Sequence, residues 1–142
     1  TIYTATVGEK TLDGSRLISK QPYLGSMFAS QNSSTWDAMQ GEDIKFDIII
    51  DDGMHTPEAN MKTFRNFFPF LKKGGNYYIE DVFPMDVMTL KELNYHWIVR
   101  HPERYSFPLY DAFLKEIEKY WITRYDLRKD SEPDSYIIKV MG

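Results

Sequence analysis

The chain has 142 residues, of which 42% are hydrophobic and 15% aromatic, and its formal net charge is −4. This is enough for one globular domain with a sizeable core. The absence of cysteine excludes disulfides, thiolate nucleophiles and thiolate zinc sites, and it suits a cytoplasmic protein. Lysine and arginine are scattered singly and no apolar run is long enough to span a membrane, so we expect neither nucleic acid nor membrane as a partner.

The first third of the chain carries weak structural signals. Residues 2–7 are rich in β-formers and predict a strand. Residues 8–20 are polar and contain two glycines, so we interpret them as a loop. The other elements expected here are a very short strand at 23–24 that ends at Gly25 and Ser26, and a short helix over 30–40.

The middle of the chain predicts a strand, a helix and a second strand. Residues 46–50 are apolar except for Asp47, which is typical of a parallel strand covered on both faces. Thr56 and Pro57 form a helix start, because a hydroxyl N-cap precedes proline at the first helical position. The predicted buried stripe of this helix is Met61, Phe64, Phe68 and Leu71, its predicted end is Lys72-Lys73 followed by Gly74, and the next strand is expected over 76–79.

The last third predicts more helix and a closing hairpin. Residues 89–99 are compatible with a helix, and residues 109–119 have a clearer apolar face. Two β-rich segments, 122–127 and 135–141, are separated by a polar turn and predict an antiparallel pair. The alternation of strands and helices indicates an α/β fold.

Two pairs of acids follow the two central strands. Asp51 and Asp52 close the first strand, and Glu80 and Asp81 close the second. Parallel strands would bring both pairs to one edge of the sheet, together with His55. Each pair alone is the usual composition of a solvated turn, but several carboxylates in one small volume need a compensating charge. A hard divalent cation such as Mg²⁺ is the natural candidate.

These segments also resemble a known family. The runs Phe46-Asp-Ile-Ile-Ile-Asp-Asp-Gly-Met-His55, Phe68-Pro-Phe-Leu-Lys-Lys-Gly-Gly75 and Tyr78-Ile-Glu-Asp81 are similar to class I S-adenosylmethionine-dependent O-methyltransferases that act on sugars. The most similar group is the magnesium-dependent macrolide-sugar enzymes of the mycinamicin and macrocin type. Their usual pattern has serine where this chain has Met54. The resemblance implies a three-layer, Rossmann-like sheet, mostly parallel, with an antiparallel C-terminal hairpin strand.

The resemblance also implies roles for individual residues and two cofactors, S-adenosylmethionine and Mg²⁺. Two adjacent sugar hydroxyls would chelate the metal, and a histidine would remove the proton from the one that is methylated. The residues so assigned are Asp52, Glu80 and Asp81 as metal ligands, His55 as general base, and Asp51, Gly25 and Ser26 as cofactor contacts.

The first strand and glycine-rich turn with which the family's fold begins have no counterpart in this sequence. No Gly-X-Gly turn occurs in the chain, and the sequence begins at Thr1 without methionine. We therefore interpret residues 1–142 as a single, partial methyltransferase-like domain that lacks its first strand. Its expected partner is a small-molecule or glycan acceptor. A homo-oligomer or an upstream domain of the same polypeptide is left open.

Two other functions remain compatible with the same residues. A metal-dependent hydrolase also uses clustered Asp, Glu and His side chains, to activate water, and needs no methyl-donor site. A non-catalytic remnant of the fold would keep the sheet without the reaction. Binding of S-adenosylmethionine, measured with and without Mg²⁺, distinguishes these alternatives.

Overall fold

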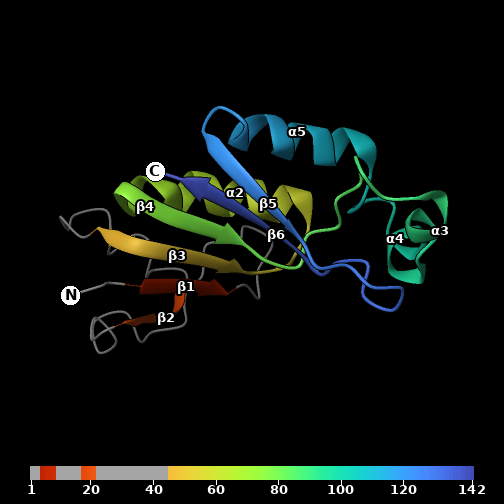
Figure 1. Cartoon of the computed structure of the whole chain (residues 1–142), viewed down its shortest axis with the longest axis horizontal. Coiled ribbons are helices and arrows are strands. Elements are labelled where there is room, and N and C mark those ends of the chain that lie inside the picture. The colour runs from red at the N-terminus through yellow and green to blue at the C-terminus, as the bar shows by residue number, and fades with distance from the viewer. Residues whose placement is uncertain (1–3, 9–16, 22–44) are drawn as a thin grey trace.

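The computed structural model describes residues 4–8, 17–21 and 45–142 (Figure 1). The expected strand at 23–24, the helix over 30–40, and Gly25 and Ser26 lie outside the described residues. The described strands form one sheet in the order β2-β1-β3-β4-β6-β5. They are β1 (Thr4–Gly8), β2 (Leu17–Gln21), β3 (Phe46–Asp52), β4 (Leu71–Ile79), β5 (Trp121–Asp126) and β6 (Tyr136–Met141). The helices are α2 (Pro57–Phe67), η2 (Phe68–Phe70), α3 (Leu90–Leu93), α4 (His96–Arg100) and α5 (Phe107–Ile117).

The sheet is parallel at its centre and antiparallel on both sides. β3 pairs in parallel with β1 and with β4. β2 pairs antiparallel with β1, while β6 pairs antiparallel with β4 and with β5. The predicted α/β fold and antiparallel C-terminal hairpin are confirmed. The expected loop over 8–20 is wrong at both ends: Gly8 belongs to β1, and β2 begins at Leu17 and pairs with β1.

The strand–helix–strand unit forms as predicted at its start and differs at its end. The Thr56 hydroxyl caps α2 by accepting a hydrogen bond from the Ala59 amide at 3.2 Å. The helix ends at Phe67, and Leu71 to Gly74 belong to β4 rather than to a helix terminus. The strand is longer because its first half pairs with the last residue of the chain: the Gly74 amide donates to the Gly142 carbonyl at 3.1 Å. Tertiary pairing thus overrides the local Lys-Lys-Gly signal.

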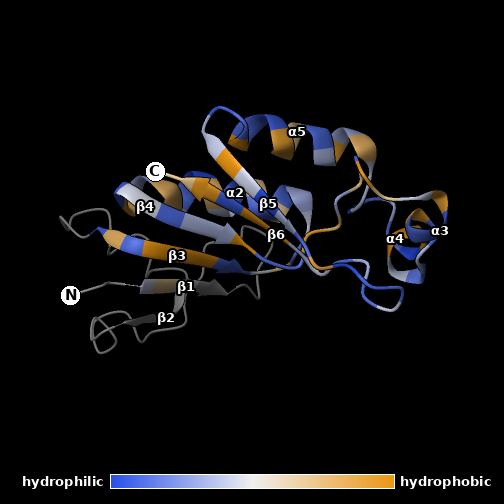
Figure 2. Ribbon diagram, in the orientation of Figure 1, coloured by the Kyte–Doolittle hydropathy of each residue, from blue (hydrophilic) through white to orange (hydrophobic). Residues whose placement is uncertain are grey.

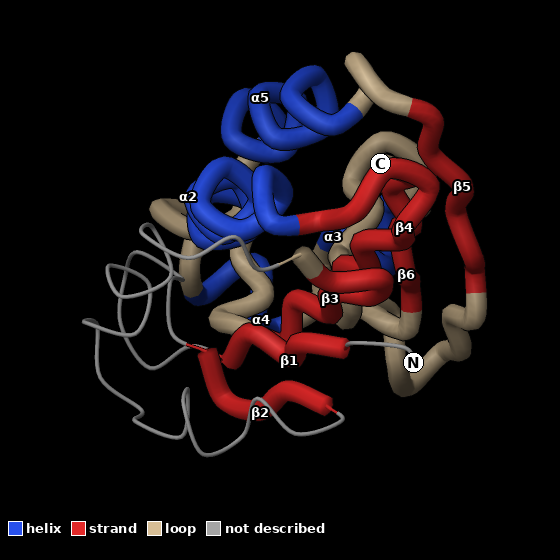
Figure 3. Tube along the Cα trace, turned by 90° about the vertical axis from the view of Figure 1, so that its left-hand side faces the viewer, coloured by secondary structure: helices blue, strands red, loops and turns tan. Residues whose placement is uncertain are grey.

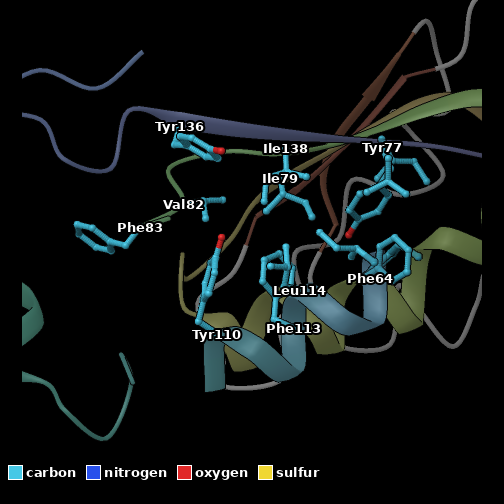
Figure 4. Close-up of a cluster of buried hydrophobic side chains, with 14 of the residues drawn as sticks. Phe64, Tyr77, Ile79, Val82, Phe83, Tyr110, Phe113, Leu114, Tyr136 and Ile138 are labelled. Carbon is cyan, nitrogen blue, oxygen red and sulfur yellow. The ribbon is translucent and has the colours of Figure 1, made fainter. Parts of the chain in front are cut away.

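Helices α2 and α5 lie side by side on one face of the sheet (Figure 3). Apolar residues are concentrated in β3, in β6 and on the sheet-facing side of α5 (Figure 2). In the core, Phe113 of α5 and Phe64 of α2 point toward Ile79 and Tyr77 of the sheet (Figure 4). Because both long helices of the described part cover the same face, a layer on the other face stays a prediction.

The segment between β4 and α5 lies beyond the carboxyl ends of β3 and β4 (Figure 1). The single helix expected over 89–99 is instead two short ones, α3 and α4, with Asn94 and Tyr95 between them. A capping box between Thr89 and Glu92 starts α3. None of the described helices is both long enough and apolar enough to cross a membrane.

Candidate functional site: an acidic edge with one histidine

Both acidic pairs lie at the same edge of the sheet, as predicted. Asp51 is paired with Ile79 across the parallel strands, so the residues that follow each strand end are neighbours. The Glu80 amide donates a hydrogen bond to the Asp51 carbonyl at 3.2 Å, which continues the ladder by one step. The parallel register is therefore what joins two sequence segments into one site.

Three side chains of this edge converge on one point. The Nε2 atom of His55 lies 3.4 Å from Oδ1 of Asp52 and 3.4 Å from Oδ2 of Asp81. One ligand atom from each residue lies within 4.8 Å of the other two. Both carboxylates are about half exposed, at 47% and 49%, so the cluster is open to solvent. We refer to Asp52, His55 and Asp81 as the edge cluster.

The imidazole of His55 is oriented by the backbone of the second strand end. Its Nδ1 atom lies 3.3 Å from the carbonyl oxygen of Glu80, which can only accept a hydrogen bond. A proton on Nδ1 satisfies that contact and leaves Nε2 facing the two carboxylates. His55 and Asp81 have φ angles of 58° and 53°, a region that non-glycine residues rarely occupy. Such backbone strain concentrates at functional sites.

Glu80 lies close to the edge cluster but is not one of its three members. Burial raises the pKa of its carboxyl group, and the neighbouring carboxylates of Asp52 and Asp81 raise the pKa further. The three acids are thus near enough to repel each other. In the described part of the chain, His55 is the basic side chain that lies within 4.0 Å of the Asp52 and Asp81 carboxylates, at 3.4 Å from each.

Asp51 has a different environment from Asp52. Its side chain is completely buried. Oδ1 accepts a hydrogen bond from the backbone amide of Gly53 at 3.0 Å, and Oδ2 accepts one from the side-chain amide of Asn60 at 2.9 Å. Burial raises its pKa to about 7, although both hydrogen bonds favour the ionised form. Each carboxylate oxygen already has a partner in the protein. The expected contact with a cofactor stays a prediction.

An open cleft of about 650 Å³ adjoins the second acidic pair. Glu80 and Asp81 lie in its lining, and most of the remaining wall comes from the β5–β6 hairpin. Arg128 lines the cleft and is held in place, because its guanidinium donates to Glu92 at 2.8 Å and to Asp126 at 2.9 Å. The cleft is within the size range of small-molecule sites.

Two further residues next to this edge were not predicted from the sequence. Asn60 is a buried polar residue on α2 that holds Asp51. Asp134 belongs to the hairpin turn, and its pKa is raised by burial and then by the charge of Asp81. A polar residue on the buried side of an amphipathic helix was a readable signal for Asn60. Nothing local distinguishes Asp134 from other turn residues.

No family model matches the chain, and no curated protein matches it. The fibrillarin pre-rRNA processing protein of Methanococcus jannaschii is 17% identical with a TM-score of 0.47, over 78% of this chain and 42% of that one. An O-methyltransferase from Bacillus cereus in complex with SAH is 12% identical with a TM-score of 0.47, over 77% and 46%. The MycE methyltransferase of the mycinamycin biosynthetic pathway, in complex with Mg and SAH, is 21% identical with a TM-score of 0.40, over 78% and 29%.

The chain spans less than half the length of each of these three structures. The identities and TM-scores are too low to assign the chain to a family.

Proposed function

We propose that this chain provides the metal-binding edge of an S-adenosylmethionine-dependent O-methyltransferase whose acceptor is a sugar hydroxyl. The observation that supports the proposal most is the convergence of Asp52, His55 and Asp81 within 4.8 Å at the carboxyl edge of the sheet. These residues come from the two segments whose sequences resemble the sugar O-methyltransferases. The parallel register of β3 and β4 joins the two segments into one site.

The donor set suits Mg²⁺. Carboxylate oxygens are the ligands that this ion prefers in proteins, and Asp52 and Asp81 offer them on the solvent side. Glu80 is the third proposed ligand. Burial raises its pKa, the charges of Asp52 and Asp81 raise that pKa further, and a cation would relieve the repulsion among the three. When bound, the ion would orient two adjacent hydroxyls of the acceptor and acidify them.

His55 is the proposed general base. Its Nε2 atom faces the position where such hydroxyls would lie, while Nδ1 is directed at the Glu80 carbonyl. The hydroxyl oxygen would form a bond to the methyl carbon of the sulfonium donor as the carbon–sulfur bond breaks. The hydroxyl proton would pass to Nε2, and the products are a methyl ether and S-adenosylhomocysteine.

The cleft beside Glu80 and Asp81 is the proposed place for the rest of the acceptor. It begins at the second acidic pair and continues along Leu127, Lys129 and Glu132 of the hairpin. Its lining mixes apolar surface with both signs of charge, which suits a ligand that carries several hydroxyl groups. Reactive hydroxyls at the acidic end would leave the remaining part of the acceptor against the hairpin.

The test is methyl transfer from S-adenosylmethionine carrying a labelled methyl group to a panel of glycosides with vicinal hydroxyls. We expect label in the glycoside when Mg²⁺ is present and a strong decrease when EDTA is added. Calorimetric titration with S-adenosylmethionine measures donor binding separately. Metal binding without donor binding or transfer, together with metal-dependent ester hydrolysis, would replace the proposal by a hydrolase. An inert protein that binds neither ligand would be a remnant.

A further inference from the structure

We propose that Asn60 is a positioning residue for the edge cluster, which it controls through Asp51. This inference rests on the proposed metal-binding function of Asp52 and Asp81. The observation behind it is a chain of two short contacts inside the protein. Asn60 Nδ2 donates to Asp51 Oδ2 at 2.9 Å, and the Gly53 amide donates to Asp51 Oδ1 at 3.0 Å.

Burial gives these contacts their importance. Asp51 has no exposed surface and Asn60 retains only 3%. A buried carboxyl group cannot exchange a lost protein partner for water, so removing one donor leaves a buried oxygen without a hydrogen-bond partner. The carboxylate of Asp51 is therefore restrained by both partners together. It cannot turn toward one without giving up the other.

The restraint acts on the turn that carries the cluster. Asp51 accepts from Gly53, and the residues on either side of this glycine along the turn are Asp52 and Met54, with His55 next. His55 adopts a positive φ of 58°, which costs free energy and persists only where the surroundings fix the backbone. Because Asn60 belongs to α2, it connects this turn to the rigid helix whose N-cap, Thr56, follows His55.

The consequence concerns metal affinity rather than stability alone. Residues that orient metal ligands without touching the metal typically change its affinity about 10–100-fold when they are replaced. We expect the same when Asn60 is replaced, since the turn held by the hydrogen bond between Asp51 and the Gly53 amide carries Asp52, one of the proposed metal ligands. The effect should be absent from a variant that keeps the amide–carboxylate pair.

Four variants test this. Asn60→Leu removes the donor and Asn60→Ser shortens it, so that one remains if the other does not fold. The exchange Asp51→Asn with Asn60→Asp restores one amide facing one carboxylate and still leaves an oxygen for the Gly53 amide. Tyr110→Phe is the matched control, because it removes a 2.8 Å hydrogen bond to the carboxylate of Asp86, outside the edge cluster.

The measurements are Mn²⁺ affinity by electron paramagnetic resonance, hydrogen exchange of the Gly53 amide, and thermal stability. We expect the two single Asn60 variants to bind Mn²⁺ at least about tenfold more weakly than the wild type. The amide hydrogen of Gly53 should also exchange with solvent faster in these variants. The exchanged pair should stay within about threefold of wild type, and Tyr110→Phe should lose stability without losing affinity. Unchanged Mn²⁺ affinity in stable single variants would overturn the inference.

Failure of the proposed function has a different signature. If the wild-type chain does not bind Mn²⁺, the metal site itself is wrong. The positioning role is then judged by NMR signals of the His55 ring and the Gly53 amide. A shift in both signals in the single variants, reversed in the exchanged pair, supports positioning of the turn. Signals that match wild type in all variants contradict it.

Discussion

Nε2 of His55 lies 3.4 Å from Oδ2 of Asp81, although one residue follows β3 and the other follows β4. The contact exists because the two strands are parallel and because the Glu80 carbonyl accepts from the opposite side of the same imidazole. His55 is therefore held between the backbone of one strand end and the carboxylates of both. This arrangement fits a base that acts beside a metal ion.

Replacing His55 by alanine should lower turnover of the proposed transfer by about 10²–10⁴-fold, the range typical of a lost general base. Binding of Mg²⁺ should change little, since the proposed ligands are carboxylates. Transfer rates and calorimetric metal titrations measure the two effects. His96→Ala is the matched control, because His96 is exposed and lies outside the edge cluster. Near-native turnover in His55→Ala would reject it as the base.

Asp51 should make the protein less stable as the pH rises. Its pKa is about 7 in the folded protein, compared with an ordinary value of 3.8, because the carboxylate is buried. Between about pH 4 and 7 the folded state holds a proton that the unfolded chain has released, so the free energy of unfolding decreases with pH. Each pKa unit corresponds to about 1.4 kcal/mol, and the total effect is therefore a few kcal/mol.

Asp51→Asn should remove this dependence and stabilise the protein at pH 7. The new amide can still accept from Gly53 and can donate to Asn60 once that side chain turns over. Chemical denaturation at several pH values between 4 and 8 measures the slope. Asp111→Asn, at an exposed position of α5, removes the same charge and should leave the slope unchanged. A slope that is the same in Asp51→Asn as in the wild-type protein would contradict the assignment.

Gly75 should tolerate no side chain. A Cβ atom there would lie 2.7 Å from the Asp47 carbonyl oxygen, which belongs to the neighbouring strand and cannot move aside. We expect Gly75→Ala to cost about 1–3 kcal/mol of stability, as for other overpacked positions. A Cβ atom at Gly74 would have no atom within 4 Å, so Gly74→Ala is strained only by the backbone φ of 82°. Thermal denaturation of the pair should therefore show the larger loss at Gly75; equal losses would disprove the close approach.

The sequence predicts those parts of the fold that depend on local pattern. The strand at 46–50, the Thr56–Pro57 helix start and the closing hairpin all form, since an apolar run, a cap and a turn each act over a few residues. The longer β4 was not predictable, because it depends on pairing between Gly74 and the distant Gly142.

In the candidate site, too, some features follow from local sequence patterns and others depend on tertiary packing. Convergence of Asp52, His55 and Asp81 follows from the parallel strands that the sequence already indicates. The burial of Asp51, its contact with Asn60 and the approach of Asp134 to Asp81 do not follow from any local pattern. They depend on how α2 and the hairpin pack against the strand ends, which is a property of the tertiary structure.

Binding of a divalent cation tests the central claim most directly. Calorimetric titration of the chain with Mg²⁺ or Mn²⁺ should give one site whose affinity falls as the pH is lowered. Protons compete with the metal for carboxylates such as Glu80, whose pKa is raised by burial and by its acidic neighbours. The double variant Asp52→Asn with Asp81→Asn should abolish binding while leaving the protein folded. Binding that is equally strong in this variant, or absent from the wild-type chain, would contradict a metal site at this edge.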